Sequence, residues 1–181
     1  MPAGGTSARR YAEAAFELAA ESNAIDPWAK DLETLASLSE ERDVLMLLDS
    51  NRVPRDEKER LLVAALGAQV SPQAVNLAKL LADRGKFGIA RQVQRTFQEM
   101  ADDRAGIAHA TVTTAVPLSP EERQAVADRL SQITGKKVDV TPVVDESIIG
   151  GVVARIGDQL IDGSTRSKLV ALKRRLELAA P

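Results

Sequence analysis

In the N-terminal part of the chain, apolar side chains recur at the three- and four-residue spacing of helices that bury one face. Ser71 before Pro72, and Asp26 before Pro27, place a side-chain oxygen ahead of a proline, a common way for a helix to begin. Gly85 is expected to end a helix. Short connections predict an antiparallel six-helix bundle. The expected helices cover 7–22, 27–39, 41–50, 55–67, 72–84 and 87–103.

In the C-terminal part the spacing changes to the two-residue alternation of half-buried strands. Ser119 and Glu122, three residues apart, form a predicted capping box at the start of a helix. The predicted order is β-α-β-β-(β)-α, a small α+β domain. Its expected elements are a strand over 108–117, a helix over 119–134, strands over 138–144, 148–156 and 159–161, and a terminal helix over 165–179.

The fold class is therefore mainly α, a six-helix bundle followed by a smaller α+β domain. The polar run Asp-Asp-Arg-Ala-Gly over 102–106 marks the change of pattern. We expect one domain over residues 1–105 and a second over residues 106–181.

Composition removes most enzymatic chemistry from consideration. Of 181 residues, 44% are hydrophobic and only 3% are aromatic, and the chain has no Cys and one His. A disulfide scaffold, a thiolate nucleophile and a cysteine-ligated metal are excluded. The glycines do not follow a phosphate-loop or dinucleotide spacing. We expect no catalytic residue, no cofactor and no metal.

The charges are balanced, 24 basic against 26 acidic side chains, so no overall basic field attracts nucleic acid or anionic lipid. A local exception is the basic run 173–175 in the expected terminal helix. A solvated face is the favoured interpretation, and a nucleic-acid-binding module built on this helix is the alternative. Aromatic residues that would stack on bases are absent from it.

Some single residues have structural interpretations. His109 has no carboxylate or second histidine close to it in the sequence and is expected to be a surface histidine. Gly150 and Gly151 are expected at a bulge or at a close approach of two backbone segments. Trp28 fits the buried stripe of the second helix.

The first predicted helix has more apolar surface than one core requires. From Tyr11 to Ala20 its apolar side chains cover about 240° of arc, whereas packing on a core needs roughly 100° or somewhat more. The fifth predicted helix also carries Leu80 among polar neighbours. Such a residue suits the centre of a helix-binding groove, although many exposed leucines have no partner.

Several sequence blocks resemble one family, the delta subunit of F-type ATP synthase, which is similar to the mitochondrial oligomycin-sensitivity-conferring protein. The resemblance spans essentially the whole chain. Glu146 departs from it, because the family often has proline there, which changes a turn. The matching blocks are Arg10-Tyr11-Ala12-Glu13-Ala14-Ala15-Phe16, Leu80-Leu81-Ala82-Asp83-Arg84-Gly85-Lys86, Ile149-Gly150-Gly151-Val152, Arg155-Ile156-Gly157-Asp158 and Ile161-Asp162-Gly163-Ser164.

The resemblance implies a non-catalytic stator subunit, one copy per complex, that links the catalytic head to the peripheral stalk while the rotor turns during proton-driven ATP synthesis. In the family, the first and fifth helices hold an N-terminal helix of an alpha subunit. The C-terminal domain binds the C-terminal end of the peripheral-stalk b subunits. By position, the alpha-binding residues are Tyr11, Ala14, Ala15, Leu18, Asn76, Lys79, Leu80 and Asp83, and the first candidates for the stalk are Leu169, Leu172 and Leu176.

The start of the chain has neither the apolar core of a signal peptide nor an Arg- and Ser-rich leader. No apolar stretch approaches the roughly 20 residues of a membrane span. We therefore expect a bacterial protein at the cytoplasmic face of the inner membrane, held there through its partners without direct membrane insertion.

Overall fold

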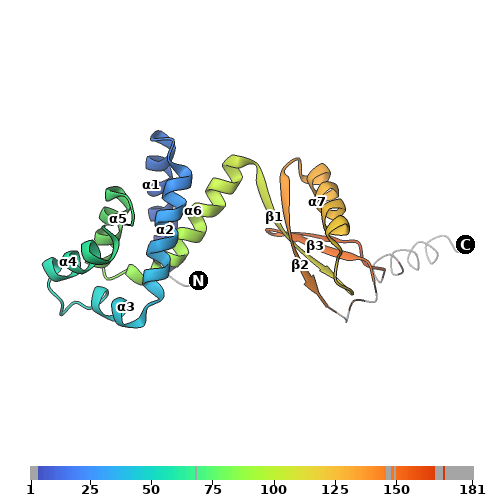
Figure 1. Ribbon diagram of the computed structural model, residues 1–181. Coiled ribbons are helices and arrows are strands. Elements are labelled where there is room, and N and C mark those ends of the chain that lie inside the picture. Colours follow the sequence, from blue (N-terminus) through green and yellow to red (C-terminus); the bar gives the residue numbers. More distant parts are fainter. Residues whose placement is uncertain (1–3, 68, 146–147, 149, 166–168, 170–181) are drawn as a thin grey trace, which may run out of the picture. The chain divides into compact units, whose positions relative to one another are not determined.

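The computed structural model describes residues 4–67, 69–145, 148, 150–165 and 169. The chain is mainly helical with a small mixed sheet, and it divides into two compact units, Met1–Ala101 and Asp102–Pro181 (Figure 1). The division falls within a helix, just before the polar run that marks the expected boundary.

All the secondary-structure elements described in the first unit are helices. A helix lies in each of the six ranges expected from the hydrophobic pattern, and a short 3-10 turn precedes the last one. The description of these helices as an antiparallel six-helix bundle stays a prediction. The helices are α1 (Gly4–Glu21), α2 (Ile25–Glu40), α3 (Arg42–Leu48), α4 (Arg55–Leu66), α5 (Pro72–Asp83) and α6 (Ala90–Ala105), with the 3-10 turn η1 at Phe87–Ile89.

The two predicted helix starts have different outcomes. Ser71 caps α5 as expected, because its side chain accepts a hydrogen bond from the Ala74 backbone N–H at 3.2 Å. The prediction that Asp26 caps α2 is wrong, since the helix begins earlier and the Trp28 N–H bonds the Ala24 carbonyl at 3.0 Å. Pro27 is tolerated inside the first turn because N–H groups there have no partner within the helix.

The core of the first unit depends on small residues of α1. Ala8, Ala12, Ala15 and Ala19 recur on one face of the helix and are all buried. Their short side chains let α1 approach the neighbouring helices closely. Larger side chains from the other helices complete this core, among them Trp28, Leu32, Leu35, Leu81, Phe87, Val93 and Phe97.

Aromatic contacts connect α1 and α2 to α6. The Phe16 ring meets the Phe97 ring edge-on, with centroids 5.6 Å apart, and Trp28 stacks on the same ring at 6.5 Å. The prediction that Trp28 is a core residue is therefore confirmed.

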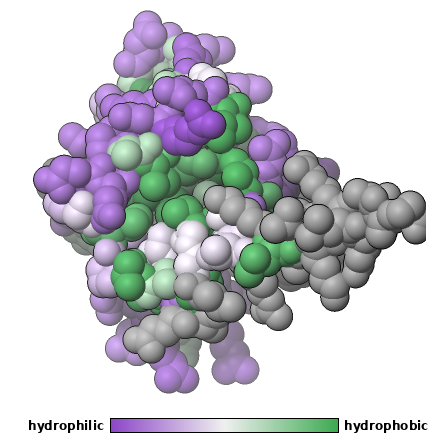
Figure 2. Space-filling model, turned by 90° about the vertical axis from the view of Figure 1, so that its right-hand side faces the viewer, coloured by the Kyte–Doolittle hydropathy of each residue, from purple (hydrophilic) through white to green (hydrophobic). Residues whose placement is uncertain are grey.

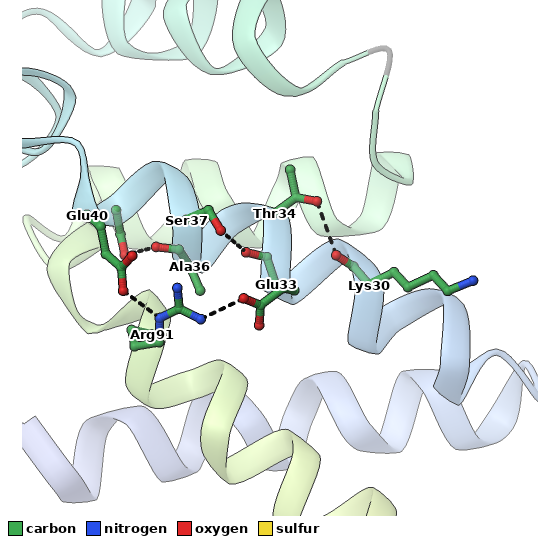
Figure 3. Close-up of polar contacts among 8 residues, drawn as sticks. Lys30, Glu33, Thr34, Ala36, Ser37, Glu40 and Arg91 are labelled. Atoms are coloured by element: carbon green, nitrogen blue, oxygen red, sulfur yellow. Dashed lines mark hydrogen bonds and ion pairs between the residues drawn. The ribbon is translucent and has the colours of Figure 1, made fainter.

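An arginine also fixes the start of α6 against α2 (Figure 3). Arg91 donates from Nε to Glu40 and from a terminal guanidinium nitrogen to Glu33, both at 2.8 Å. The hydrogen bond from Arg91, assisted by its charge, lowers the pKa of Glu40. This fork joins two carboxylates nearly two turns apart on α2 to a single residue of α6.

Over the residues that the structure describes, the second unit is a four-stranded mixed sheet against which helix α7 (Pro120–Thr134) packs. The capping box of Ser119 and Glu122 at its start is confirmed. The sheet order is β2-β1-β3-β4; β1 and β2 are parallel, and the other two pairings are antiparallel. The strands are β1 (Ile107–Thr114), β2 (Lys137–Val144), β3 (Val152–Ile156) and β4 (Gln159–Asp162).

The strand expected over 148–156 begins later, at Val152, because the backbone before it turns through two glycines. Gly151 has φ +91°, and a Cβ built there would lie 2.7 Å from the Gly163 carbonyl oxygen. The predicted close approach of backbone segments is confirmed. Of the terminal helix expected over 165–179, only residues 165 and 169 lie within the described part of the chain, and both are helical.

Candidate partner-binding surface

The apolar side chains of α1 divide into a buried stripe and an exposed flank. Leu18 is 52% exposed, Ala14 is exposed and Tyr11 is half-buried. Ala15, by contrast, is only 2% exposed and belongs to the core. The surplus apolar surface of α1 therefore comes from Tyr11, Ala14 and Leu18, and the side chain of Ala15 contributes to packing within the unit.

A hydrogen bond identifies what this flank of α1 faces. Ser7, Tyr11, Ala14 and Leu18 follow one another at spacings of four, three and four residues, so they share one side of the helix. The Ser7 hydroxyl accepts a hydrogen bond at 3.2 Å from Nζ of Lys86, which lies just beyond the end of α5. The start of the exposed flank of α1 thus lies beside the segment that follows α5. Phe16, about 170° around the helix from the centre of this flank, faces α6.

The outer surface of α5 combines apolar and polar positions. Leu80 is 43% exposed, Asn76 is exposed, and Leu77 is half-buried against the core. Leu77 and Leu80 are three residues apart and therefore neighbours on the helix surface. The hydrophobic pattern predicts Leu77 as a core residue, and it is only partly buried because it lies at the edge of the buried face.

Two polar residues of α5 are already engaged with α4. Lys79 pairs with Glu59 at 3.3 Å, and Asp83 pairs with Arg55 at 3.0 Å. Arg55 also bonds Glu59 at 3.0 Å, so four side chains form one network across the two helices. The hydrogen bond from Arg55, followed by that from Lys79, lowers the pKa of Glu59.

Sequence reasoning missed Arg55 and Glu59. Their spacing of four residues within a predicted helix was the available signal, because such pairs are neighbours on a helix surface. Their contact with α5 could not be derived from that spacing, since it depends on how the two helices pack.

A hollow of about 610 Å³ lies at the C-terminal end of α5. Leu80 forms an apolar part of its wall, and charged side chains form most of the rest. The lining residues are Arg55, Lys58, Leu80, Asp83 and Arg84, with Asn51 and Val53 from the segment before α4.

In the second unit, His109 is a surface histidine, as predicted, and two carboxylates lie near its ring. Its Nε2 lies 2.8 Å from Oδ2 of Asp102 and its Nδ1 lies 3.8 Å from Oδ2 of Asp139. Asp102, seven residues earlier, reaches the ring from the end of α6, and Asp139 lies opposite His109 on the parallel strand β2. Arg123 of α7 also approaches Asp139, at 3.4 Å.

Apolar side chains gather on the face of the second unit that Figure 2 presents. One hollow of this unit, about 620 Å³, lies between α7 and strands β3 and β4, with Leu130, Ile133, Val152 and Ile161 in its lining. Leu169, a predicted stalk contact, is exposed. Leu172 and Leu176, and the basic run 173–175 of the nucleic-acid alternative, lie outside the described residues.

Within the described residues, no group of three or more His, Cys, Asp or Glu side chains is arranged to hold a metal ion. Over the same part of the chain, no helix has the length and apolar character needed to cross a membrane. The described residues of the first unit instead form a surface in which exposed apolar side chains are bordered by paired charges.

Comparisons with known proteins agree over nearly the whole chain. The family described as ATP synthase delta (OSCP) subunit matches residues 8–176. ATP synthase subunit delta of Anaeromyxobacter sp. (strain Fw109-5) is 40% identical over 96% of this chain and 98% of its own. The corresponding protein of Dehalococcoides mccartyi (strain ATCC BAA-2266 / KCTC 15142 / 195) is 36% identical over 93% of each.

A solved structure shares the fold at lower identity. A chain in the cryo-EM structure of the Toxoplasma gondii mitochondrial ATP synthase hexamer matches with a TM-score of 0.62 and 21% identity, over 96% of this chain and 98% of that one.

Proposed function

The chain belongs to the ATP synthase delta (OSCP) subunit family, and from that membership we propose that its first unit holds an N-terminal helix of an alpha subunit between α1 and α5. It is a structural subunit of the stator and not a catalytic one. In this proposal the first unit binds the catalytic head and the second unit binds the peripheral stalk, so that the head does not turn with the rotor.

The observation that carries the proposal is the exposed apolar flank shared by the two helices. Tyr11, Ala14 and Leu18 of α1 are on the side that borders the end of α5, and Leu77 and Leu80 of α5 are incompletely buried. An amphipathic helix laid against both would remove these side chains from water. Ala14 favours this docking because its small side chain lets a second helix backbone come close.

The mechanical role depends on slow dissociation and needs no turnover. Dissociation rates vary far more than association rates among related complexes, and they depend on well-packed anchors. Leu18 and Leu80 are the anchors in this proposal. Asn76 and the ion pairs of Lys79 and Asp83 form a polar rim, which selects the partner and excludes water.

For the second unit we propose binding to the C-terminal end of the stalk b subunits. Leu169 is the described residue that supports it, through its exposed apolar side chain; Leu172 and Leu176 remain sequence-based candidates. We also propose that each complex contains one copy of the chain, at the cytoplasmic face of the bacterial inner membrane. Its attachment there is through partner subunits.

The test is binding of a synthetic peptide that copies the N-terminal segment of the same organism's alpha subunit. We expect saturable binding of the full chain by isothermal titration calorimetry and a gain of helical signal in circular dichroism on mixing. Leu18→Asp should weaken binding at least tenfold, since it puts a charge into the apolar contact. The matched control is Leu61→Asp on α4, an exposed leucine that is not among the residues of the proposed groove. The proposal fails if the wild-type chain and peptide do not bind.

A further inference from the structure

The hollow at the C-terminal end of α5 carries an excess of positive charge that the network between α4 and α5 does not neutralise. Three cations line it, Arg55, Lys58 and Arg84, against the single carboxylate of Asp83. Arg55 is paired with that carboxylate at 3.0 Å and with Glu59 at the same distance. Lys58 and Arg84 are left as the unbalanced charges of the hollow.

Lys58 is held in an unusual position for a lysine. The residue is only 6% exposed, and its Nζ donates to the Ala82 carbonyl oxygen at 3.2 Å, at the negative end of the α5 dipole. Among the described residues, no carboxylate lies within ion-pair distance of it. A buried ammonium group is favoured by an opposite charge nearby, and an anion in the hollow would supply one.

Arg84 directly follows α5 and forms the other side of this positive area. Within the described part of the chain, its guanidinium group makes no ion pair or side-chain hydrogen bond. A planar guanidinium with its donors available can bind a carboxylate through two parallel hydrogen bonds. The two side chains together form a place for one anionic group.

The position of the hollow indicates which anion it takes. Leu80, an anchor of the proposed groove, is also part of the wall of the hollow. A helix lying against Leu80 can therefore extend a side chain into the hollow, with its methylene groups against Leu80 and its charged end between Lys58 and Arg84. An acidic side chain has both of these parts, whereas a free phosphate has no apolar part for Leu80 to contact.

We propose that this hollow binds a glutamate or aspartate side chain of the helix that docks between α1 and α5, with Arg84 and Lys58 as its partners. The inference rests on the proposed function and adds the chemistry of the partner. The apolar flank determines that a helix binds, and the acidic side chain fixes its register along the groove.

The test is a double-mutant cycle with the alpha-subunit peptide, in which Arg84→Gln is combined in turn with amide replacements of each acidic residue of the peptide. We expect Arg84→Gln to weaken binding about tenfold, the low end of the range for a hydrogen bond to a charged group. One peptide replacement should cause the same loss, and the two together should cause no more. The salt dependence of binding should also fall.

The matched control is Arg52→Gln, which removes the same charge from an exposed arginine outside the lining of the hollow. Lys58→Met, which keeps the apolar stem, should reproduce the effect of Arg84→Gln. Inorganic phosphate should compete with the peptide for the wild-type chain and should not compete for Arg84→Gln.

The outcomes separate this inference from the proposed function. If the wild-type chain binds the peptide and both Arg84→Gln and Lys58→Met change the affinity less than twofold, the hollow is not part of the interface and the inference is overturned, while the groove stands. Phosphate binding that leaves the peptide affinity unchanged would equally overturn it. If the peptide does not bind at all, the proposed function itself is wrong.

Discussion

Replacement of Leu80 tests the proposed groove, because the exposed fraction of this side chain allows the expected loss of binding free energy to be estimated. Full burial of a leucine side chain is worth about 1.5–3 kcal/mol. Leu80 is 43% exposed in the free chain, so docking can add about 0.6–1.3 kcal/mol from this side chain. Leu80→Ala should therefore weaken peptide binding about fivefold, since 1.4 kcal/mol corresponds to a factor of ten.

Leu80→Asp should cost more, because the complex must also desolvate a new carboxylate. We expect a loss of more than about 2 kcal/mol, or roughly thirtyfold in affinity. The assay is titration calorimetry with the alpha-subunit peptide. Emission of Trp28, the single tryptophan, checks in parallel that the first unit is folded, because the ring is buried in its core.

Leu61→Asp provides the matched control. Leu61 is 39% exposed on α4, so its replacement introduces the same charge at similar exposure away from the groove. Equal affinities of the Leu80→Asp and Leu61→Asp variants, both folded, would refute the reasoning and remove Leu80 from the binding surface.

Three further predictions concern the fold. Gly151→Ala should destabilise the second unit by about 2 kcal/mol or more in a denaturant titration followed by circular dichroism, because the new Cβ would lie 2.7 Å from a carbonyl oxygen at φ +91°. Gly106→Ala, with φ +67° and no atom within 4 Å, should cost only about 1 kcal/mol. Phe97→Ala should destabilise the first unit by about 3–5 kcal/mol in urea, because the ring is fully buried; a loss below about 1 kcal/mol would contradict its place in the core. Arg91 lowers the pKa of Glu40 from its ordinary value of 4.5, so the pair stabilises the fold above that pH and ceases to do so as pH falls through the lower folded value. The difference in Tm between wild type and Glu40→Gln should therefore shrink in acid, and a difference independent of pH would exclude the pair as its cause.

Local chemistry made some parts of the fold predictable. Ser71 and the Ser119–Glu122 pair mark helix starts because a side-chain oxygen satisfies N–H groups a few residues away. Gly151 marks a close approach because no other residue lacks a Cβ. Asp26 misled the same reasoning, since a proline within the first turn is compatible with more than one helix start.

The candidate surface was predictable only in outline. The excess of apolar residues on α1 can be counted from the sequence. Which of them remain exposed depends on the neighbouring helices, and hydrophobic periodicity does not identify these neighbours. Ala15 joins the core and Leu18 stays exposed although both belong to the same apolar arc. Leu77 has the spacing of a core residue on α5 and lies at the edge of the buried face.

The sequence by itself determined the helix and strand segments, the absence of cysteine chemistry and the family, because these depend on residues close together or on matched blocks. Tertiary structure alone decided that Lys79 and Asp83 pair with α4, that Asp102 meets His109, and that Lys58 is buried beside Arg84. These contacts join residues through the packing of separate elements. A short-range sequence pattern does not predict how separate elements pack. That packing determines the charge and shape of the proposed binding surface.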